Sequence, residues 1–276
     1  MDLFQLAADN RLHLEERFTA MKATLAPAEA DRLGRFATMV DEFGRISINM
    51  RQTTLLSFLT FGSHQHMYEW ARSRAAHSSM PADAIMKERM KGFYEHRVFF
   101  DTQFDGANTF QYGALNIGGL GATAYGDFCL VLDDHVSSDR PRIAYLRSDS
   151  LKAYVGPGPI LDQDSLNRDI APHSHRQMLA ALKHSSEILA FPQVRWPSIL
   201  CNASQYVEAI ITGGVTRVDI EAVRMDKLDY DLFFEFAFQD FRSKLADADR
   251  FRIDMFVLIL QLLEDHHVPL ELINHA

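Results

Sequence analysis

One glutamate stands alone in an apolar stretch of the chain. The stretch runs from Gln205 to Gly214, and Glu208 is its only charged residue. If the stretch is a strand, Tyr206, Glu208 and Ile210 share one face, because successive side chains of a strand alternate between faces. An unpaired carboxylate in such a half-buried setting is costly in free energy, which favours a functional residue. The alternative is a glutamate at a sheet edge whose side chain reaches solvent.

One arginine is placed similarly in the segment from Tyr94 to Asp101, which the residue pattern predicts to be a strand. On a strand, Arg97 would point to the same face as Phe99 and Asp101. Its charge would be costly there unless an anionic group faced it, and a dinucleotide pyrophosphate would serve. The alternative is a structural salt bridge between Arg97 and Asp101 or a neighbouring acid.

Several common catalytic motifs are absent from the sequence. There is no glycine-rich phosphate loop followed by Lys-Ser/Thr, no G-x-S-x-G and no H-E-x-x-H. The glycine run of residues 118–121 lacks a strand-then-helix context and is interpreted as a turn. Three histidine pairs lack a carboxylate or cysteine at useful spacing, so we interpret them as surface or capping residues and predict no metal site; they are His64/His66, His173/His175 and His266/His267.

The elements that would position these residues follow from hydrophobic periodicity. From Leu3 to about His96 the apolar residues recur at helical spacing, which predicts four or five helices. Glycine and proline mark the expected helix starts, ends and connections; they are Pro27, Gly44, Gly62 with Ser63, and Pro81.

A sheet is expected after Tyr94, where β-branched and aromatic residues alternate with polar ones. The predicted strands are Tyr94 to Asp101, Tyr112 to Ile117, Tyr125 to Leu132, Arg142 to Leu146, Gln205 to Thr212 and Arg217 to Val223. The predicted helices of this part are Ser174 to Phe191, Phe233 to Leu245 and Phe251 to Leu263. Because strands and helices do not alternate strictly, the predicted fold class is α+β. We expect a helical region over residues 1–92 and a sheet-containing core with C-terminal helices over residues 93–276.

The composition bears on three properties of the protein: its partners, the state of its cysteines and its relation to membranes. The chain has 276 residues, 47% of them hydrophobic, and a formal net charge of -9 without a Lys/Arg stripe, so nucleic acid is a poor candidate partner. Cys129 and Cys201 lie in apolar stretches and are expected to be reduced core thiols. The longest apolar stretch, Met255 to Leu263, is shorter than the roughly 20 residues of a membrane span. We expect a soluble protein without a Sec-type signal, while non-Sec export would leave no reliable mark.

The order of several short motifs resembles a bacterial family of ADP-ribosyltransferases. This family includes the CteC-type effectors, which are injected by type III secretion and modify a threonine of host ubiquitin. The similarity covers roughly Tyr94 to Val223. The motifs are, in chain order, R-V-F-F-D-T-Q, Y-G-A-L-N, Y-G-D-F-C-L-V-L, Y-V-E-A-I-I-T-G-G-V and V-D-I-E-A-V.

This resemblance implies an ADP-ribosyltransferase-like split-sheet core and roles for individual residues. Arg97 would take the place of the family's arginine on the first core strand, and Glu208 that of its catalytic glutamate. The second motif would correspond to the run Tyr112-Gly113-Ala114-Leu115-Asn116. Many relatives hold Glu or Gln two residues before the catalytic glutamate, whereas this chain has Tyr206, which suits a hydroxyl acceptor. The serine-threonine-serine element of the wider superfamily has no recognisable counterpart.

The resemblance also implies NAD as co-substrate. Glu208 would stabilise the oxocarbenium-like ribose, and Arg97 would clamp the phosphates. Phe100 or Tyr112 would stack on the nicotinamide ring. Its amide would be bound by Thr102, Gln103 or Asn116.

The implied function is transfer of ADP-ribose to a threonine hydroxyl of a protein acceptor. The most specific version of this prediction has host ubiquitin as the acceptor, so that the modification blocks ubiquitination. Two alternatives stay open. One is an NAD glycohydrolase toxin that uses water as acceptor in the same pocket. The other is a non-enzymatic binding module on a degenerate scaffold.

Overall fold

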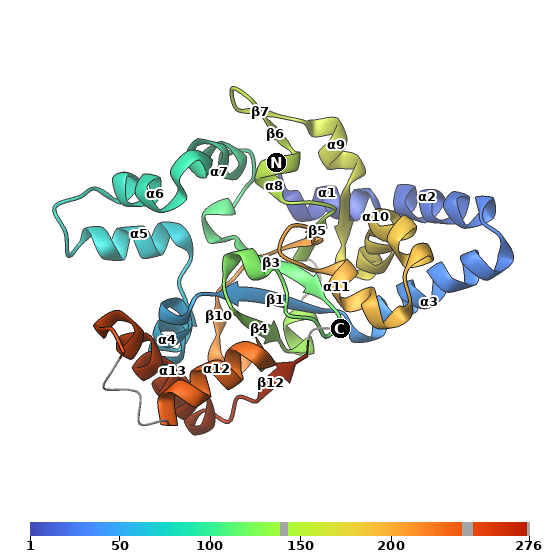
Figure 1. The fold of residues 1–276 in the computed structure, drawn as a ribbon. Helices are drawn as coiled ribbons and strands as arrows, with labels where there is room; N and C mark the ends of the chain where they lie inside the picture. Colours follow the sequence, from blue (N-terminus) through green and yellow to red (C-terminus); the bar gives the residue numbers. More distant parts are fainter. Residues whose placement is uncertain (139–142, 239–244, 275–276) are drawn as a thin grey trace.

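The computed structural model describes residues 1–138, 143–238 and 245–274 (Figure 1). Its helices are α1 (Leu3–Asp9), α2 (Arg11–Thr24), α3 (Pro27–Phe43), α4 (Gln52–Phe61), α5 (Met67–Ala75), α6 (Ala82–Met90), α7 (Tyr94–Thr102), α8 (Ser150–Ala153), α9 (Gln163–Arg168), α10 (Arg176–Ala190), α11 (Trp196–Leu200), α12 (Lys227–Phe238) and α13 (Asp247–Asp265). Its strands are β1 (Arg45–Met50), β2 (Ser63–His64), β3 (Gln111–Asn116), β4 (Phe128–Leu132), β5 (Ile143–Leu146), β6 (Val155–Gly156), β7 (Ile160–Leu161), β8 (Ile170–Pro172), β9 (Glu208–Ile211), β10 (Val215–Thr216), β11 (Ile220–Asp226) and β12 (Leu270–Ile273).

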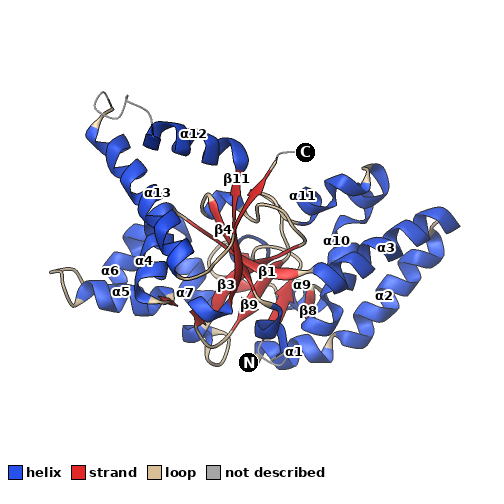
Figure 2. Cartoon of the chain, turned by 90° about the horizontal axis from the view of Figure 1, so that it is seen from below, coloured by secondary structure: helices blue, strands red, loops and turns tan. Residues whose placement is uncertain are grey.

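Eight of these strands form one sheet in the order β12-β11-β4-β1-β3-β9-β5-β8. Only the edge pair β11 and β12 is parallel, and the other neighbours are antiparallel. The remaining strands make the short pairs β10-β2 and β6-β7. Figure 2 shows the twisted sheet with helices on both sides of it. The fold class is therefore α+β with helices toward both ends of the chain, as the sequence predicts.

Each face of the sheet has its own apolar core. Ile46, Ile48, Ala209 and Ile211 point into the larger core together with side chains of α3, α4, α10 and α13. The opposite face carries a smaller core built by α1, α7 and the segment around α9, together with Ile210. Since side chains of a strand alternate, the residues of β9 on this second face are Glu208 and Ile210. The sheet thus directs Glu208 toward α7 and α8.

The helical interpretation of the first 92 residues is wrong at residues 45–50. These residues form β1, which lies inside the eight-stranded sheet between β4 and β3. The sheet thus takes strands from both sides of the predicted boundary at residues 92 and 93. The predicted breaks hold elsewhere: α3 begins at Pro27 and ends before Gly44, Gly62 caps the end of α4, and α6 follows Pro81.

The strand predicted from Tyr94 to Asp101 is also wrong, because these residues form helix α7. Arg97, Phe100 and Asp101 are its buried residues, and Phe104 is buried just beyond its end. This spacing of three and four residues is that of a helix face, and it places charged groups among the buried positions. Arg97 therefore does not lie on a core strand.

The other predicted elements are present with shifted ends. Strands β3, β4, β5, β9 and β11 overlap the five other predicted strand segments, and α10, α12 and α13 overlap the three predicted helices. Residue Arg142 of one predicted strand, and residues 239–244 of the helix predicted around Phe233 to Leu245, lie outside the described residues. Cys129 and Cys201 are buried free thiols, as expected.

Within the described part of the chain, no helix combines the length and apolar composition that a bilayer crossing requires. The longest one, α13, has 19 residues and includes acidic side chains.

Candidate functional site

Glu208 lies at the first position of β9, opposite Ala114 of β3 on one side and Leu146 of β5 on the other. Its side chain is buried, and its Oε2 accepts a hydrogen bond of 2.8 Å from the backbone N–H of Ser150. Burial raises the pKa of Glu208 to about 7, although the charge of Arg97 opposes this rise. The sheet-edge alternative is therefore wrong, and the carboxyl group titrates near neutral pH.

Arg97 lies across from Glu208, in a buried network of polar groups. Its Nη1 is 3.3 Å from Asp101 Oδ1, and its Nη2 donates to Ser150 Oγ at 3.4 Å. The guanidinium carbon is 3.7 Å from the centre of the Tyr112 ring, a cation–π contact. Burial lowers the pKa of Arg97, but Tyr112, Asp101 and Glu208 outweigh it and hold the pKa above its ordinary value. The structural salt bridge that the sequence left open is thus present.

Asp101 holds this network together. It accepts hydrogen bonds from the hydroxyls of Tyr112 at 2.7 Å and Tyr68 at 2.8 Å, in addition to its pair with Arg97. Burial raises the pKa of Asp101, while Arg97 and the two hydroxyls oppose this rise. Three donors on one buried carboxylate provide the pairing that a buried charge requires.

Arg97 and Glu208 therefore meet on one side of the sheet, although they come from distant parts of the sequence. Ser150 lies between them: its backbone N–H binds Glu208 and its hydroxyl binds Arg97. Tyr112 is on the same sheet face, because it pairs with Ile210 in the register of β3 and β9. The structure brings Arg97, Tyr112 and Glu208 together.

A second polar cluster, nearer the surface, adjoins Glu208. Asp149 Oδ2 accepts hydrogen bonds from the hydroxyls of Tyr125 at 2.9 Å and Tyr206 at 2.8 Å. The charge of Asp149 adds to the raised pKa of Glu208. Tyr125 is half exposed, whereas Tyr206 is buried. Lys183 of α10 donates to the backbone carbonyl of Tyr206, and burial lowers the pKa of this lysine to about 8.

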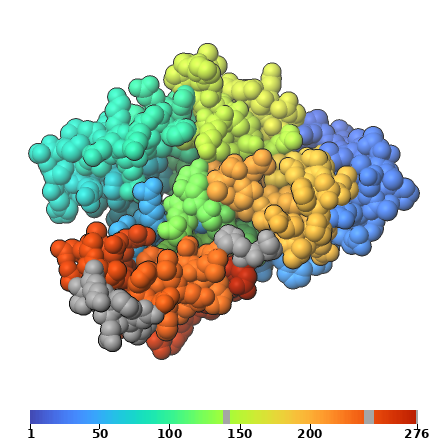
Figure 3. All heavy atoms as spheres, viewed as in Figure 1, coloured from blue at the N-terminus to red at the C-terminus, as the bar shows by residue number. Residues whose placement is uncertain are grey.

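A pocket of about 870 Å³ opens beside the Arg97 network. Its lining comes from α4, β2, α5, α6, α7 and β3, and Asp101 and Tyr112 belong to both the pocket and the network. In Figure 3 the part of the surface that protrudes in teal is formed by α5, α6 and α7. Arg97 and Glu208 do not line the pocket themselves. They lie behind the wall that Tyr112 and Asp101 form.

Three predicted cofactor contacts do not line the pocket, although the Phe100 ring centre lies 5.8 Å from the guanidinium carbon of Arg97. Phe100 is fully buried in the smaller core, with its ring centre 4.9 Å from that of Phe104. The hydroxyl of Thr102 donates to the Phe99 carbonyl, and Gln103 Nε2 donates to the same carbonyl. These three residues pack and end helix α7, and they do not line the described pocket.

Gly113 and Asn116 have structural roles in the sheet. A Cβ on Gly113 would lie 2.7 Å from the Ser47 carbonyl oxygen, so this position must be glycine for β1 and β3 to approach. Asn116 is fully buried, and its side chain accepts from the Gly119 N–H at 2.8 Å and donates to the Gly119 carbonyl at 2.9 Å. The asparagine fixes the turn that follows β3.

The sequence interpretation missed most of the pocket. His64 hydrogen-bonds Gln111, and His66 caps α5 by accepting from the Tyr68 N–H. Both histidines line the pocket, whereas the sequence predicts only surface or capping roles for this pair. His173 and His175 are buried and therefore not surface residues. The useful signal was the His64/His66 pair followed by an aromatic and basic helix, α5.

Among the described residues, no group of three or more His, Cys, Asp or Glu side chains is arranged to hold a metal ion. The chain matches no protein-family model, and no curated protein is similar to it in sequence.

Proposed function

We propose that this protein is an NAD-dependent mono-ADP-ribosyltransferase that modifies a hydroxyl of a protein acceptor. The observation that carries the proposal is the buried Glu208 carboxyl group, whose pKa is raised to about 7, beside Arg97 and Tyr112. The motif resemblance supports the same assignment. In its sharpest form, the acceptor is a threonine of host ubiquitin, the modification blocks ubiquitination, and the protein reaches the host cytosol as a type III effector.

The chemistry requires one carboxylate near the reacting ribose. The bond between the nicotinamide nitrogen and C1′ breaks, and its electron pair leaves with nicotinamide. The ionised carboxylate of Glu208 stabilises the positive charge that develops on the ribose, as in glycoside cleavage. The acceptor hydroxyl then bonds to C1′ and releases its proton to solvent.

In this proposal Arg97 is a positioning residue and does not clamp the pyrophosphate. Its charge is already paired with Asp101, and its ring contact with Tyr112 and hydrogen bond to Ser150 hold both beside Glu208. Because Glu208 is buried and bound to the Ser150 N–H, catalysis requires the start of α8 to move and admit the ribose. We propose that Tyr112 contacts the nicotinamide end, and its position in the pocket lining supports this role.

The test is nicotinamide release by Glu208→Gln. The amide keeps the size of the side chain but cannot stabilise the ribosyl cation as an anion does, so we expect turnover to fall at least about a hundredfold. The matched control is Glu221→Gln, which changes a glutamate of β11 whose partner is Arg45 and which lies outside the site. Retained turnover in Glu208→Gln, with intact folding, contradicts the assignment.

Two further measurements separate the acceptor classes. Intact mass spectrometry of ubiquitin after incubation with NAD should show the gain of one ADP-ribose, lost when a single threonine is replaced. Isotopic NAD with cell lysate should label protein. Nicotinamide release without any labelled protein would instead indicate NAD glycohydrolysis. If neither nicotinamide release nor labelled protein is detected, the protein is a non-enzymatic binding module.

A further inference from the structure

The pocket beside the Arg97 network contains arginines that the fold does not neutralise. Arg74 of α5 and Arg89 of α6 line it, and Arg51, just before α4, is close enough to affect Arg89. Burial, and then the like charges of Arg51 and Arg74, hold the pKa of Arg89 below its ordinary value. Among the residues that the structure describes, none of these arginines has a carboxylate within ion-pairing distance.

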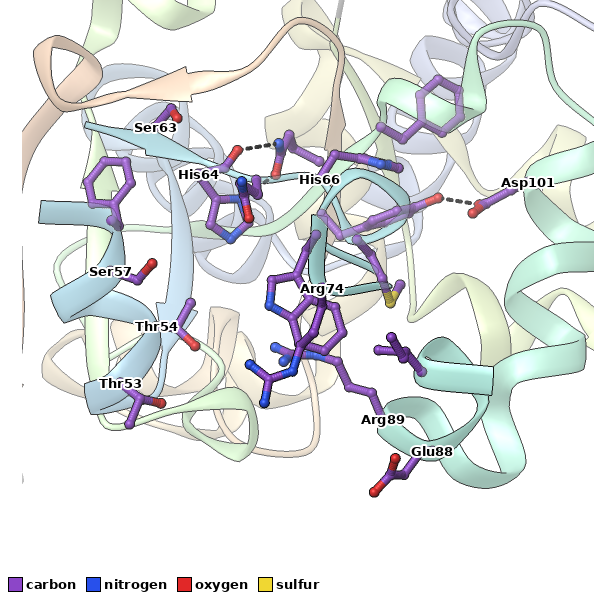
Figure 4. A pocket seen from close by; sticks show the side chains of 18 of the residues that line it. Thr53, Thr54, Ser57, Ser63, His64, His66, Arg74, Glu88, Arg89 and Asp101 are labelled. Carbon is purple, nitrogen blue, oxygen red and sulfur yellow. Dashed lines mark hydrogen bonds between the residues drawn. The ribbon is translucent and has the colours of Figure 1, made fainter. Parts of the chain in front are cut away.

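Two acids line the same pocket, and neither cancels this charge. Asp101 is taken up by Arg97 and two tyrosine hydroxyls. Glu88 makes no ion pair with the pocket arginines. In Figure 4, Arg74 and Arg89 extend into the same space, opposite the hydroxyls of Thr53, Thr54 and Ser57 on α4. Guanidinium groups facing hydroxyl donors form an environment that suits phosphate oxygens.

An aromatic ring lies beside these cations. The guanidinium carbon of Arg89 is 4.3 Å from the ring centre of Trp70, and that of Arg74 is 6.0 Å from it. Trp70 lines the pocket as well. A planar base can stack on such an aromatic or guanidinium surface. The pocket volume of about 870 Å³ is within the range of small-molecule sites.

We propose that this pocket binds a nucleoside diphosphate, with Arg74 and Arg89 on the diphosphate and the base against Trp70. Where the nucleotide is the ADP half of NAD, this inference rests on the proposed function. The diphosphate would then lie at the mouth formed by α4, α5 and α6, and the nicotinamide half would extend toward Tyr112. Neither arginine belongs to the motifs that suggested the function.

The first test is ADP binding by calorimetry at low salt. We expect saturable binding by the wild-type protein, weaker binding of AMP, and a loss of affinity of about tenfold or more in Arg74→Gln and in Arg89→Gln, because each removes charge-assisted hydrogen bonds. The matched control is Arg72→Gln on the same helix, whose side chain binds the Tyr68 carbonyl and does not line the pocket. Its affinity should equal that of the wild type.

The second test uses tryptophan fluorescence. The chain has two tryptophans, and Trp196 is buried in the larger core against Phe36, so a ligand in the pocket reports through Trp70. ADP should change the emission of the wild type, and the change should disappear in Trp70→Phe. Inorganic pyrophosphate should bind more weakly than ADP, because it has no base.

Three results would overturn the inference: no ADP binding by the wild type, equal ADP affinity in the Arg74, Arg89 and Arg72 variants, or pyrophosphate binding as tight as that of ADP. These failures are distinct from failure of the proposed function. Nicotinamide release that is unaffected by the Arg74 and Arg89 changes would reject the pocket and keep the transferase. Arginine-dependent ADP binding without nicotinamide release would reject the transferase and keep the nucleotide pocket.

Discussion

The arginines near the pocket form two groups with opposite surroundings: Arg97 alone, and the pair Arg74 and Arg89. Arg97 is buried, Asp101 pairs with its charge and Tyr112 covers its face, while its Nε has no hydrogen-bond partner among the described residues. Arg74 and Arg89 line an open pocket, both lie near the ring of Trp70, and neither makes an ion pair with a described residue. A buried charge with its partners in place is part of the structure, whereas an accessible charge without partners is available to a ligand. The residue type alone does not separate these cases.

The largest expected effect comes from breaking the buried pair. Asp101→Asn removes the carboxylate that faces Arg97 and leaves the guanidinium buried without a counter-charge, which typically costs about 3–5 kcal/mol of unfolding free energy. Denaturant unfolding measures this loss. The control is Asp31→Asn, which breaks the exposed pair between Asp31 and Arg35 and should cost less than about 1 kcal/mol. A loss that is as small for Asp101→Asn would show that the network does not stabilise the fold.

The next effect concerns how stability varies with pH around Glu208. Its pKa is raised from 4.5 to about 7 in the folded protein, so the folded state holds a proton that the unfolded state has lost. The resulting stabilisation is fully present below about pH 4.5 and is lost as the pH rises through about 7, a change on the order of 3 kcal/mol. Glu208→Gln should lack this decrease, which unfolding curves across the range would measure. Parallel curves for the two proteins would contradict the raised pKa.

The smallest effect is expected at the open arginines. Arg89→Gln removes a cation–π contact with Trp70, worth at most about 1 kcal/mol, and at the same time relieves repulsion by Arg51 and Arg74. Its melting temperature should therefore stay close to that of the wild type, while its affinity for ADP falls. A large loss of stability would mean that Arg89 supports the fold in the way that Arg97 does, and the contrast between the two groups would disappear.

The sequence predicted the fold class, the strand that carries Glu208 and a half-buried setting for this residue, which the structure shows to be buried. These predictions succeeded because β9 is a short apolar run with strand periodicity, in which a carboxylate stands out. Helix α7 was not predicted because two of its buried residues, Arg97 and Asp101, are charged. Hydrophobic periodicity treats charged residues as exposed, so the buried face of this helix does not show in the pattern. Its aromatic and β-branched residues then favoured a strand.

The strand β1 was missed for a different reason. Ile46, Ile48 and Met50 alternate with Ser47 and Asn49, which is a strand pattern. The run has only six residues and lies between helices α3 and α4, so it was interpreted as part of the helical region. The pocket could not be predicted from spacing at all. Its walls come from six elements, and only the tertiary arrangement brings Arg74 and Arg89 to one opening beside Tyr112.

The central position of β1 has a consequence for how the protein is made. This strand leaves the ribosome early, yet both of its neighbours, β3 and β4, are synthesised much later, and the edge strand β12 comes near the end of the chain. Until then both hydrogen-bonding edges of β1 are open, a state that promotes aggregation and slows acquisition of the native topology. Nascent chains should therefore depend on chaperones, and a chain cut between residues 92 and 93 should yield two fragments that become ordered only after they reassociate.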